Sequence, residues 1–211
     1  MKARTLILGA ALVLFPLSPL PDATAASDAV EAAVTEHELA IDGQPIAFEA
    51  RAEMLELIDE SGAVAAQVFT VSYLVEDAEL DRPVTFMMNG GPGAASAYLH
   101  VGGVGPWTIR TDPIGRPADE GRLRANRHSW LAHTDLVFID PVGTGFSRAA
   151  EADDDSFFER DADLDSLADV IETWLAARNR RASPVFVAGE SYGGYRAAAL
   201  PKRLRHDRGI A

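Results

Sequence analysis

The chain has 211 residues, of which 47% are hydrophobic and 24% are charged, and it contains no cysteine. This is an ordinary globular balance, so collagen, a coiled coil and wholesale disorder are excluded for the whole chain, and the missing cysteines exclude disulfides, thiolate zinc sites and cysteine nucleophiles. The net charge of −13 argues against binding to nucleic acid or anionic lipid.

The first 25 residues have the order of a secretory signal peptide. Two basic residues precede an apolar run over residues 6–15, and an Ala-Thr-Ala stretch offers a cleavage site after residue 25. The run is half as long as the roughly 20 residues that a membrane-spanning helix needs. We therefore predict cleavage of residues 1–25, a periplasmic or extracellular location, no membrane span after cleavage, and one domain over residues 26–211.

The first half of the mature chain carries strand patterns. Residues 26–39 are polar and rich in alanine, and we expect a loose N-terminus there. Apolar residues alternate over residues 45–58, and a β-rich run covers residues 64–75 after a turn signal, which predicts an antiparallel hairpin. A short apolar strand pattern follows over residues 83–88. We expect a loop over residues 110–126, where proline, glycine and charge are scattered.

The second half alternates between strand and helix patterns. A strand is predicted over residues 135–140. Ser156 and Glu159 form a capping-box pattern ahead of apolar residues that recur every three or four positions, which predicts a helix. Another apolar strand covers residues 184–188, and a helix follows over residues 192–205. This alternation predicts a parallel α/β sheet that follows the hairpin.

No metal or cofactor site is expected. Asp161, Asp163 and Asp165 imitate the opening of a calcium loop, but Ser166 stands where that loop requires glycine. We therefore expect a solvated, acidic helix start. The five histidines show no metal-binding spacing.

Two glycine-rich motifs carry the chemistry. The sequence GESYG at residues 189–193 matches G-x-S-x-G between a strand and a helix, where this pattern forms a nucleophile elbow that exposes Ser191. The sequence NGGPG at residues 89–93 follows an earlier strand and can direct backbone N–H groups at a tetrahedral oxyanion. In the α/β-hydrolase plan, Gly91 and Tyr192 would supply these two donors. The alternatives are a plain glycine-rich turn for the first motif and a phosphate-binding loop for the second.

In this order the motifs resemble the serine carboxypeptidases, peptidase family S10, over about residues 83–205. The resemblance rests on NGGPGAAS at 89–96, GPW at 105–107, NRHSW at 126–130, DLVFIDPVGTGFS at 135–147 and GESYGGY at 189–195. It implies an α/β-hydrolase fold and the removal of C-terminal residues from peptides or proteins. It also implies that Ser191 is the nucleophile and that the amides of Gly91 and Tyr192 form the oxyanion hole.

By the same resemblance, Asn89, Gly90 and Glu190 would bind the terminal carboxylate of the substrate. Some neighbouring positions depart from the family pattern. Met87 replaces a tryptophan, which changes one wall of the carboxylate pocket, and Gly103 replaces a glutamate, which removes a second carboxyl group. A third departure, alanine for cysteine at position 94, removes a thiol near the site.

A larger departure concerns the catalytic base. The hydrolase order is serine, then an acid, then histidine. After Ser191 only His206 remains, and at about 1.5 Å rise per residue a straight helix would place it roughly 22 Å away. We therefore expect the N-terminal part of a longer hydrolase, with its fold cut after the elbow, an exposed edge at residues 184–188 and almost no activity of the chain alone. The alternatives are another α/β-hydrolase, such as an esterase or aminopeptidase, and an inactive module.

Overall fold

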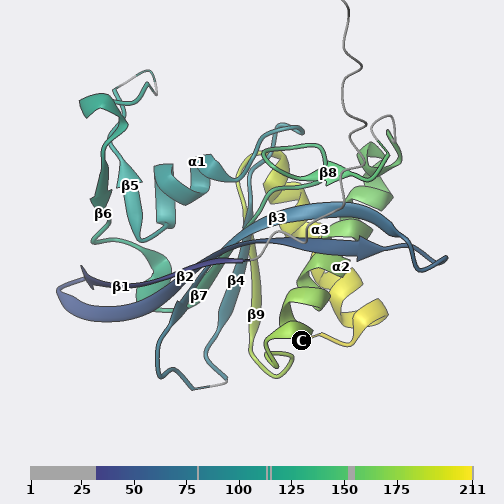
Figure 1. Cartoon of the computed structure of the whole chain (residues 1–211), viewed down its shortest axis with the longest axis horizontal. Helices are drawn as coiled ribbons and strands as arrows, with labels where there is room; N and C mark the ends of the chain where they lie inside the picture. Colours follow the sequence, from purple (N-terminus) through teal and green to yellow (C-terminus); the bar gives the residue numbers. More distant parts are fainter. Residues whose placement is uncertain (1–31, 80, 113, 115, 152–154, 211) are drawn as a thin grey trace, which may run out of the picture.

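The computed structural model describes residues 32–79, 81–112, 114, 116–151 and 155–210 (Figure 1). The predicted signal peptide, residues 1–25, lies outside these residues, so its cleavage and the start of the domain at residue 26 stay predictions. No helix among the described residues combines the length and the apolar character needed to cross a membrane.

The chain alternates between strands and helices, with an extended hairpin first. The strands are β1 (Ala33–Ile41), β2 (Gln44–Ile58), β3 (Val64–Val75), β4 (Val84–Met88), β5 (Trp107–Ile109), β6 (Leu123–Ala125), β7 (Asp135–Ile139), β8 (Arg148–Ala149) and β9 (Val185–Gly189). The long α-helices are α2 (Arg160–Ala177) and α3 (Tyr192–Arg208), and the short helical segments are α1 (Ala97–Leu99), η1 (His100–Val104), η2 (Asp119–Gly121), η3 (Trp130–Ala132) and η4 (Asp155–Phe158).

One mixed sheet organises the molecule. Its strand order is β1-β2-β3-β7-β4-β9, and the short β8 pairs with β3. The strands β1, β2, β3 and β7 are successive antiparallel neighbours, whereas β7, β4 and β9 run parallel. The predicted hairpin and the predicted parallel α/β sheet are both confirmed.

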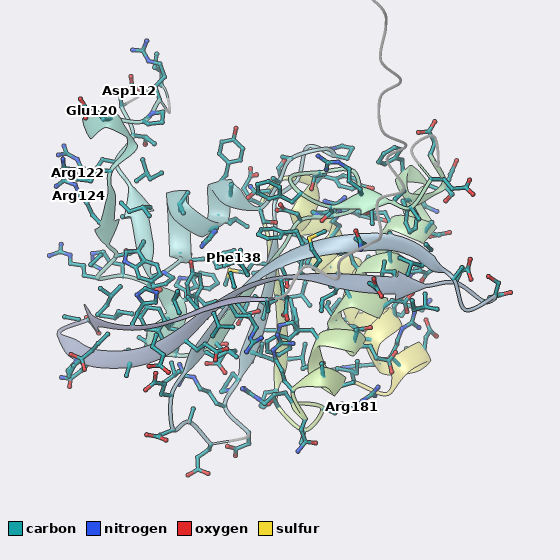
Figure 2. All side chains as sticks on the ribbon, viewed as in Figure 1. Asp112, Glu120, Arg122, Arg124, Phe138 and Arg181 are labelled. Atoms are coloured by element: carbon teal, nitrogen blue, oxygen red, sulfur yellow. The ribbon has the colours of Figure 1, made fainter. Side chains whose placement is uncertain are left out.

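The core has two layers because side chains alternate between the faces of a strand. Phe86 and Met88 of β4 belong to a cluster with the buried faces of α2 and α3, including Trp174. Met87, between them, points to the other face and joins a second cluster with Phe138. Figure 1 shows α2 and α3 lying side by side, and Figure 2 places Phe138 in the middle of the molecule.

Three local predictions were wrong. Residues 33–39 of the segment expected to be loose belong to the edge strand β1, which pairs with β2 along its whole length. Residues 110–126, expected to form a loop, contain the strand β6. It pairs with β5 in a projecting arm that carries Asp112, Glu120, Arg122 and Arg124 (Figure 2). The capping pattern does not mark the start of α2, which begins at Arg160 with Glu159 at its N-cap and no side-chain cap.

Candidate active site

Ser191 stands at a sharp bend between β9 and α3. Its backbone has φ 56° and ψ −121°, a conformation that is rare for a residue with a side chain and that clusters at functional sites. The bend is closed by the Gly193 amide, which donates to the Glu190 carbonyl at 2.8 Å. Ser191 is exposed, so a solute can reach its hydroxyl.

The glycines around Ser191 allow the close packing of this bend. A Cβ atom on Gly189 would lie 2.1 Å from the Gly193 carbonyl oxygen, and one on Gly193 would lie 2.3 Å from the Met88 carbonyl oxygen. Both contacts are with backbone, which cannot move aside cheaply. Side chains at these two positions would therefore collide with the backbone of the bend.

The second glycine motif lies directly against the bend. A Cβ atom on Gly90 would lie 2.4 Å from the Tyr192 backbone nitrogen and 3.0 Å from the Ser191 Cβ. The next residue, Gly91, has φ +104°, which turns the loop, and the Ala94 amide closes it by donating to the Gly90 carbonyl at 3.1 Å. The structure thus brings together the two loops that the sequence singled out.

Asn89 and Glu190 are also brought together. The Asn89 side-chain nitrogen donates to a Glu190 carboxylate oxygen at 3.2 Å. Its side-chain oxygen accepts from the Leu99 amide at 2.9 Å, which fixes the amide orientation. Asn89 is buried, whereas Glu190 is exposed beside Ser191. The hydrogen bond between them therefore fixes an exposed carboxylate to a buried side chain.

Ser96 and Asp140 hold the glycine loop through hydrogen bonds. The Ser96 amide donates to the Asp140 carboxylate at 2.7 Å, and the Ser96 hydroxyl donates to the Ile139 carbonyl. The same hydroxyl accepts from the Asn89 amide at 3.3 Å. These bonds tie the loop after β4 to the end of β7, the neighbouring parallel strand.

Sequence reasoning missed one buried ion pair beside the site. Asp163, expected on a solvated helix start, is buried and receives two hydrogen bonds from the buried Arg196. Both line a cavity of about 200 Å³ that is also walled by Gly93, Tyr192 and Phe157. An arginine four residues after Tyr192 on the same helix face is a signal, but its partner could not be found from spacing.

A general base for Ser191 would be a histidine that bonds to its hydroxyl. None of the hydrogen bonds among the described residues joins the Ser191 hydroxyl to a histidine. His100 pairs with the Tyr73 hydroxyl, and burial lowers the pKa of His100 to about 4. His206 lies in the last turn of α3, as expected, at the far end of the helix that follows Ser191. Within the described part of the chain, no group of three His, Asp or Glu side chains could hold a metal ion.

The sheet order, the elbow at Ser191 and the adjoining glycine loop define an α/β-hydrolase. A family model described as serine carboxypeptidase matches residues 53–208, and the chain belongs to that family. It is 30% identical over 149 residues to the pheromone-processing carboxypeptidase KEX1 of Saccharomyces cerevisiae, covering 64% of this chain and 19% of that protein.

The chain is also 32% identical over 117 residues to serine carboxypeptidase-like 35 of Arabidopsis thaliana, covering 54% of this chain and 23% of the relative. The matches thus span about a fifth of the length of these two proteins. Among solved structures, an esterase of Pyrobaculum calidifontis aligns with a TM-score of 0.41 and 19% identity, over 76% of this chain and 41% of the esterase.

Proposed function

We propose that this chain carries the nucleophile and the substrate-carboxylate site of a serine carboxypeptidase that removes C-terminal residues from peptides or proteins. Ser191 is the nucleophile, and the amides of Gly91 and Tyr192 stabilise the oxyanion. The observation that carries the proposal is the contact of Gly90 with the Tyr192 amide, beside an exposed serine in a strained conformation.

The chemistry is acyl transfer in two halves. The Ser191 hydroxyl gives its proton to a general base while its oxygen adds to the carbonyl carbon of the last peptide bond. The resulting oxyanion accepts hydrogen bonds from the two amides, each worth about 3 kcal/mol of transition-state stabilisation. The C–N bond then breaks, the amine takes the proton, and the C-terminal amino acid leaves. Water attacks the Ser191 ester in the same way and releases the shortened peptide.

Asn89, Gly90 and Glu190 define the end of the peptide that is read. Asn89 offers a side-chain amide held in place by Leu99, and Gly90 offers a backbone amide at the same edge. Glu190 can hydrogen-bond a substrate carboxylate only when one of the two carboxyl groups carries a proton, because two adjacent carboxylates repel each other. This supports recognition of a free C-terminus immediately beside the nucleophile.

We infer that the general base and its acidic partner come from polypeptide that this sequence does not contain. The inference rests on the described hydrogen bonds, which leave Ser191 without a histidine partner, and on the position of His206 at the end of α3. Triad members act as a unit, so loss of the base costs about a millionfold in turnover. The 211-residue chain alone should therefore hydrolyse peptides at a negligible rate.

Labelling of Ser191 tests the assignment of the nucleophile. In a polypeptide that restores the downstream residues, a fluorophosphonate should modify Ser191 specifically, and Ser191→Ala should abolish the modification. Ser129, which is buried and caps η3, provides a control serine that should stay unlabelled. Failure to label Ser191 would favour the second candidate, a noncatalytic module. That candidate is supported by the described hydrogen bonds, none of which joins Ser191 to a histidine.

The substrate class is tested on a polypeptide that restores the downstream residues. Cleavage of an N-blocked peptide with a free C-terminus, and not of its C-terminal amide, is the expected result. Faster turnover of simple esters would instead indicate an esterase, and release of N-terminal residues would indicate an aminopeptidase.

We also propose that the protein is exported and that residues 1–25 direct the export. The order of charge, apolar run and small residues supports this. Sequencing the N-terminus of the protein recovered from the periplasm or the medium should begin at Ala26. A product that keeps Met1 and stays inside the cell would contradict it.

A further inference from the structure

Arg196 is a buried arginine that touches three separate parts of the candidate site. Its side chain is 3% exposed and lies in the second turn of α3. The Nε and Nη2 atoms donate to the two Asp163 carboxylate oxygens at 2.8 and 2.6 Å. The remaining Nη1 atom donates to the Asn89 carbonyl oxygen at 3.0 Å. One planar group therefore connects α3, α2 and the end of β4.

The Asn89 carbonyl is mechanically linked to the proposed oxyanion loop. A peptide unit is planar, so fixing the carbonyl of Asn89 also fixes the direction of the Gly90 amide. Gly90 is in contact with the Tyr192 nitrogen, and Gly91 follows it directly with φ +104°. The position of Arg196 is thus transmitted through one peptide unit to the backbone next to the nucleophile.

Arg196 also lies over the side chain of Tyr192. The centre of its guanidinium group is 5.0 Å from the centroid of the Tyr192 ring, within the range of a cation–π contact. The two residues are four positions apart on a helix and so share a face. Arg196 therefore contacts Asn89, which precedes Gly90 and Gly91 in the proposed oxyanion loop, and Tyr192, which supplies the other proposed donor.

The geometry needs the fork of an arginine. Two nitrogens engage Asp163 while the third remains for Asn89, whereas a lysine ammonium is a point charge that cannot span both partners in this arrangement. Asp163 keeps Arg196 from turning, and the pair is buried on both sides. A second bridge between the same helices, Arg203 to Asp161 and Asp165, lies at the surface.

We propose that Arg196, oriented by Asp163, is a positioning residue that sets the direction of the Gly90 and Gly91 amides and of Tyr192 around the oxyanion. This role rests on the proposed function, in which those amides stabilise the transition state. Arg196 takes no proton and touches no reacting atom. Its effect is on the rate of reaction at Ser191 and not on the charge of the nucleophile.

The unfolding and NMR measurements use the 211-residue chain, and the labelling with a fluorophosphonate uses the polypeptide that restores the downstream residues and with them the general base. Arg196→Lys keeps the charge and loses the fork. The double variant Arg196→Gln with Asp163→Asn replaces the ion pair by two amides that can bond to each other, so no charge is left buried alone. Arg203→Lys is the matched control, because it alters the other α3-to-α2 bridge without touching Asn89. For each variant we would measure the unfolding midpoint, the second-order labelling rate of Ser191 and the amide NMR resonances of Gly90, Gly91 and Tyr192.

We expect the two Arg196 variants to label at least about tenfold more slowly at a temperature where they are folded, a smaller loss than outright deletion of an oxyanion donor. The three amide resonances should move in the Arg196 variants and stay in place in Arg203→Lys, which should label at the wild-type rate. A folded Arg196 variant with unchanged rate and resonances would overturn the positioning role while leaving the proposed function intact. If wild-type Ser191 itself does not react, the proposed function fails, and the resonances alone then decide whether Arg196 sets the loop.

Discussion

The Asn89 side chain donates a hydrogen bond to Glu190 at 3.2 Å across 101 positions of sequence. The reason is the parallel pairing of β4 with β9, whose register places Met88 opposite Gly189. The residues that follow the two strands must then emerge together at the carboxyl edge of the sheet, where open α/β sheets bind their ligands. Two motifs that lie far apart in the chain thereby form one site.

Asn89→Asp should destabilise the fold through this contact. The new carboxylate would be buried against Glu190, and Glu190 would lose the N–H donor that Asn89 now provides. We expect this to cost about 2 kcal/mol of stability at pH 7. At a pH of about 4 the loss should shrink, because a protonated carboxyl group can donate again. Urea unfolding at both pH values measures this. The exposed Asn179→Asp is the control, and an equal effect of both variants would contradict the explanation.

Gly90→Ala adds a single methyl group but should lower both the stability of the fold and the reactivity of Ser191. The added Cβ would meet the Tyr192 nitrogen at 2.4 Å and the Glu190 carbonyl oxygen at 2.7 Å, so one of the two loops must shift. We expect a loss of about 1–3 kcal/mol in stability. In the polypeptide that restores the general base, we expect at least about a tenfold slower labelling of Ser191 by a fluorophosphonate. Gly102→Ala, which has no atom within 4 Å of the new Cβ, should leave the labelling rate unchanged. Comparable labelling of both variants would show that the loop tolerates displacement.

His100 should make the stability of the fold depend on pH. Burial lowers its pKa to about 4 in the folded protein, whereas the unfolded chain protonates histidine near pH ~6.5. Between these values the unfolded state binds the extra proton, so stability falls as the pH falls from about 6.5 to about 4, by up to about 3 kcal/mol in total.

The comparison of wild type with His100→Gln isolates this contribution, because other groups titrate equally in both. Glutamine can still bond to the Tyr73 hydroxyl but does not titrate. The difference in the free energy of unfolding between the two proteins should therefore change between pH 7.5 and about pH 5. Parallel pH profiles would mean that His100 is protonated as easily in the folded as in the unfolded chain.

Strand and helix positions followed from periodicity wherever apolar residues were buried on a regular face. The buried runs of β4 and β7 and the apolar face of α2 are examples, because burial imposes their patterns. The edge strand β1 was missed because its side chains are mostly exposed and carry no such pattern. The pair Asp42-Gly43, with φ values of 49° and 78°, was the available signal, since this dipeptide favours the tight turn of a hairpin.

The residues of the candidate site also differ in whether the local sequence could predict them. The glycines around Ser191 were predictable because a tight bend excludes side chains locally, and the local sequence shows it. The Arg196–Asp163 pair was not, since it depends on how α2 and α3 pack. Asp163 was expected in solvent because acidic residues surround it, yet only its neighbours Asp161 and Asp165 are exposed.

The edge formed by β9 should govern the solubility of the chain. Among the described residues β9 pairs with β4 alone, and Phe186 at the middle of the strand is 55% exposed, as the predicted apolar edge requires. An open strand edge with apolar side chains promotes association with other chains, and a charge on it blocks this. Phe186→Lys should therefore slow aggregation, measured by light scattering during heating, with little change in the urea midpoint.

The control is Ile58→Lys, which removes a side chain with nearly equal exposure, 56%, from the end of β2. Because β2 has neighbours on both sides, this control should aggregate like the wild type, and equal protection by both substitutions would attribute the effect to net charge instead of the β9 edge.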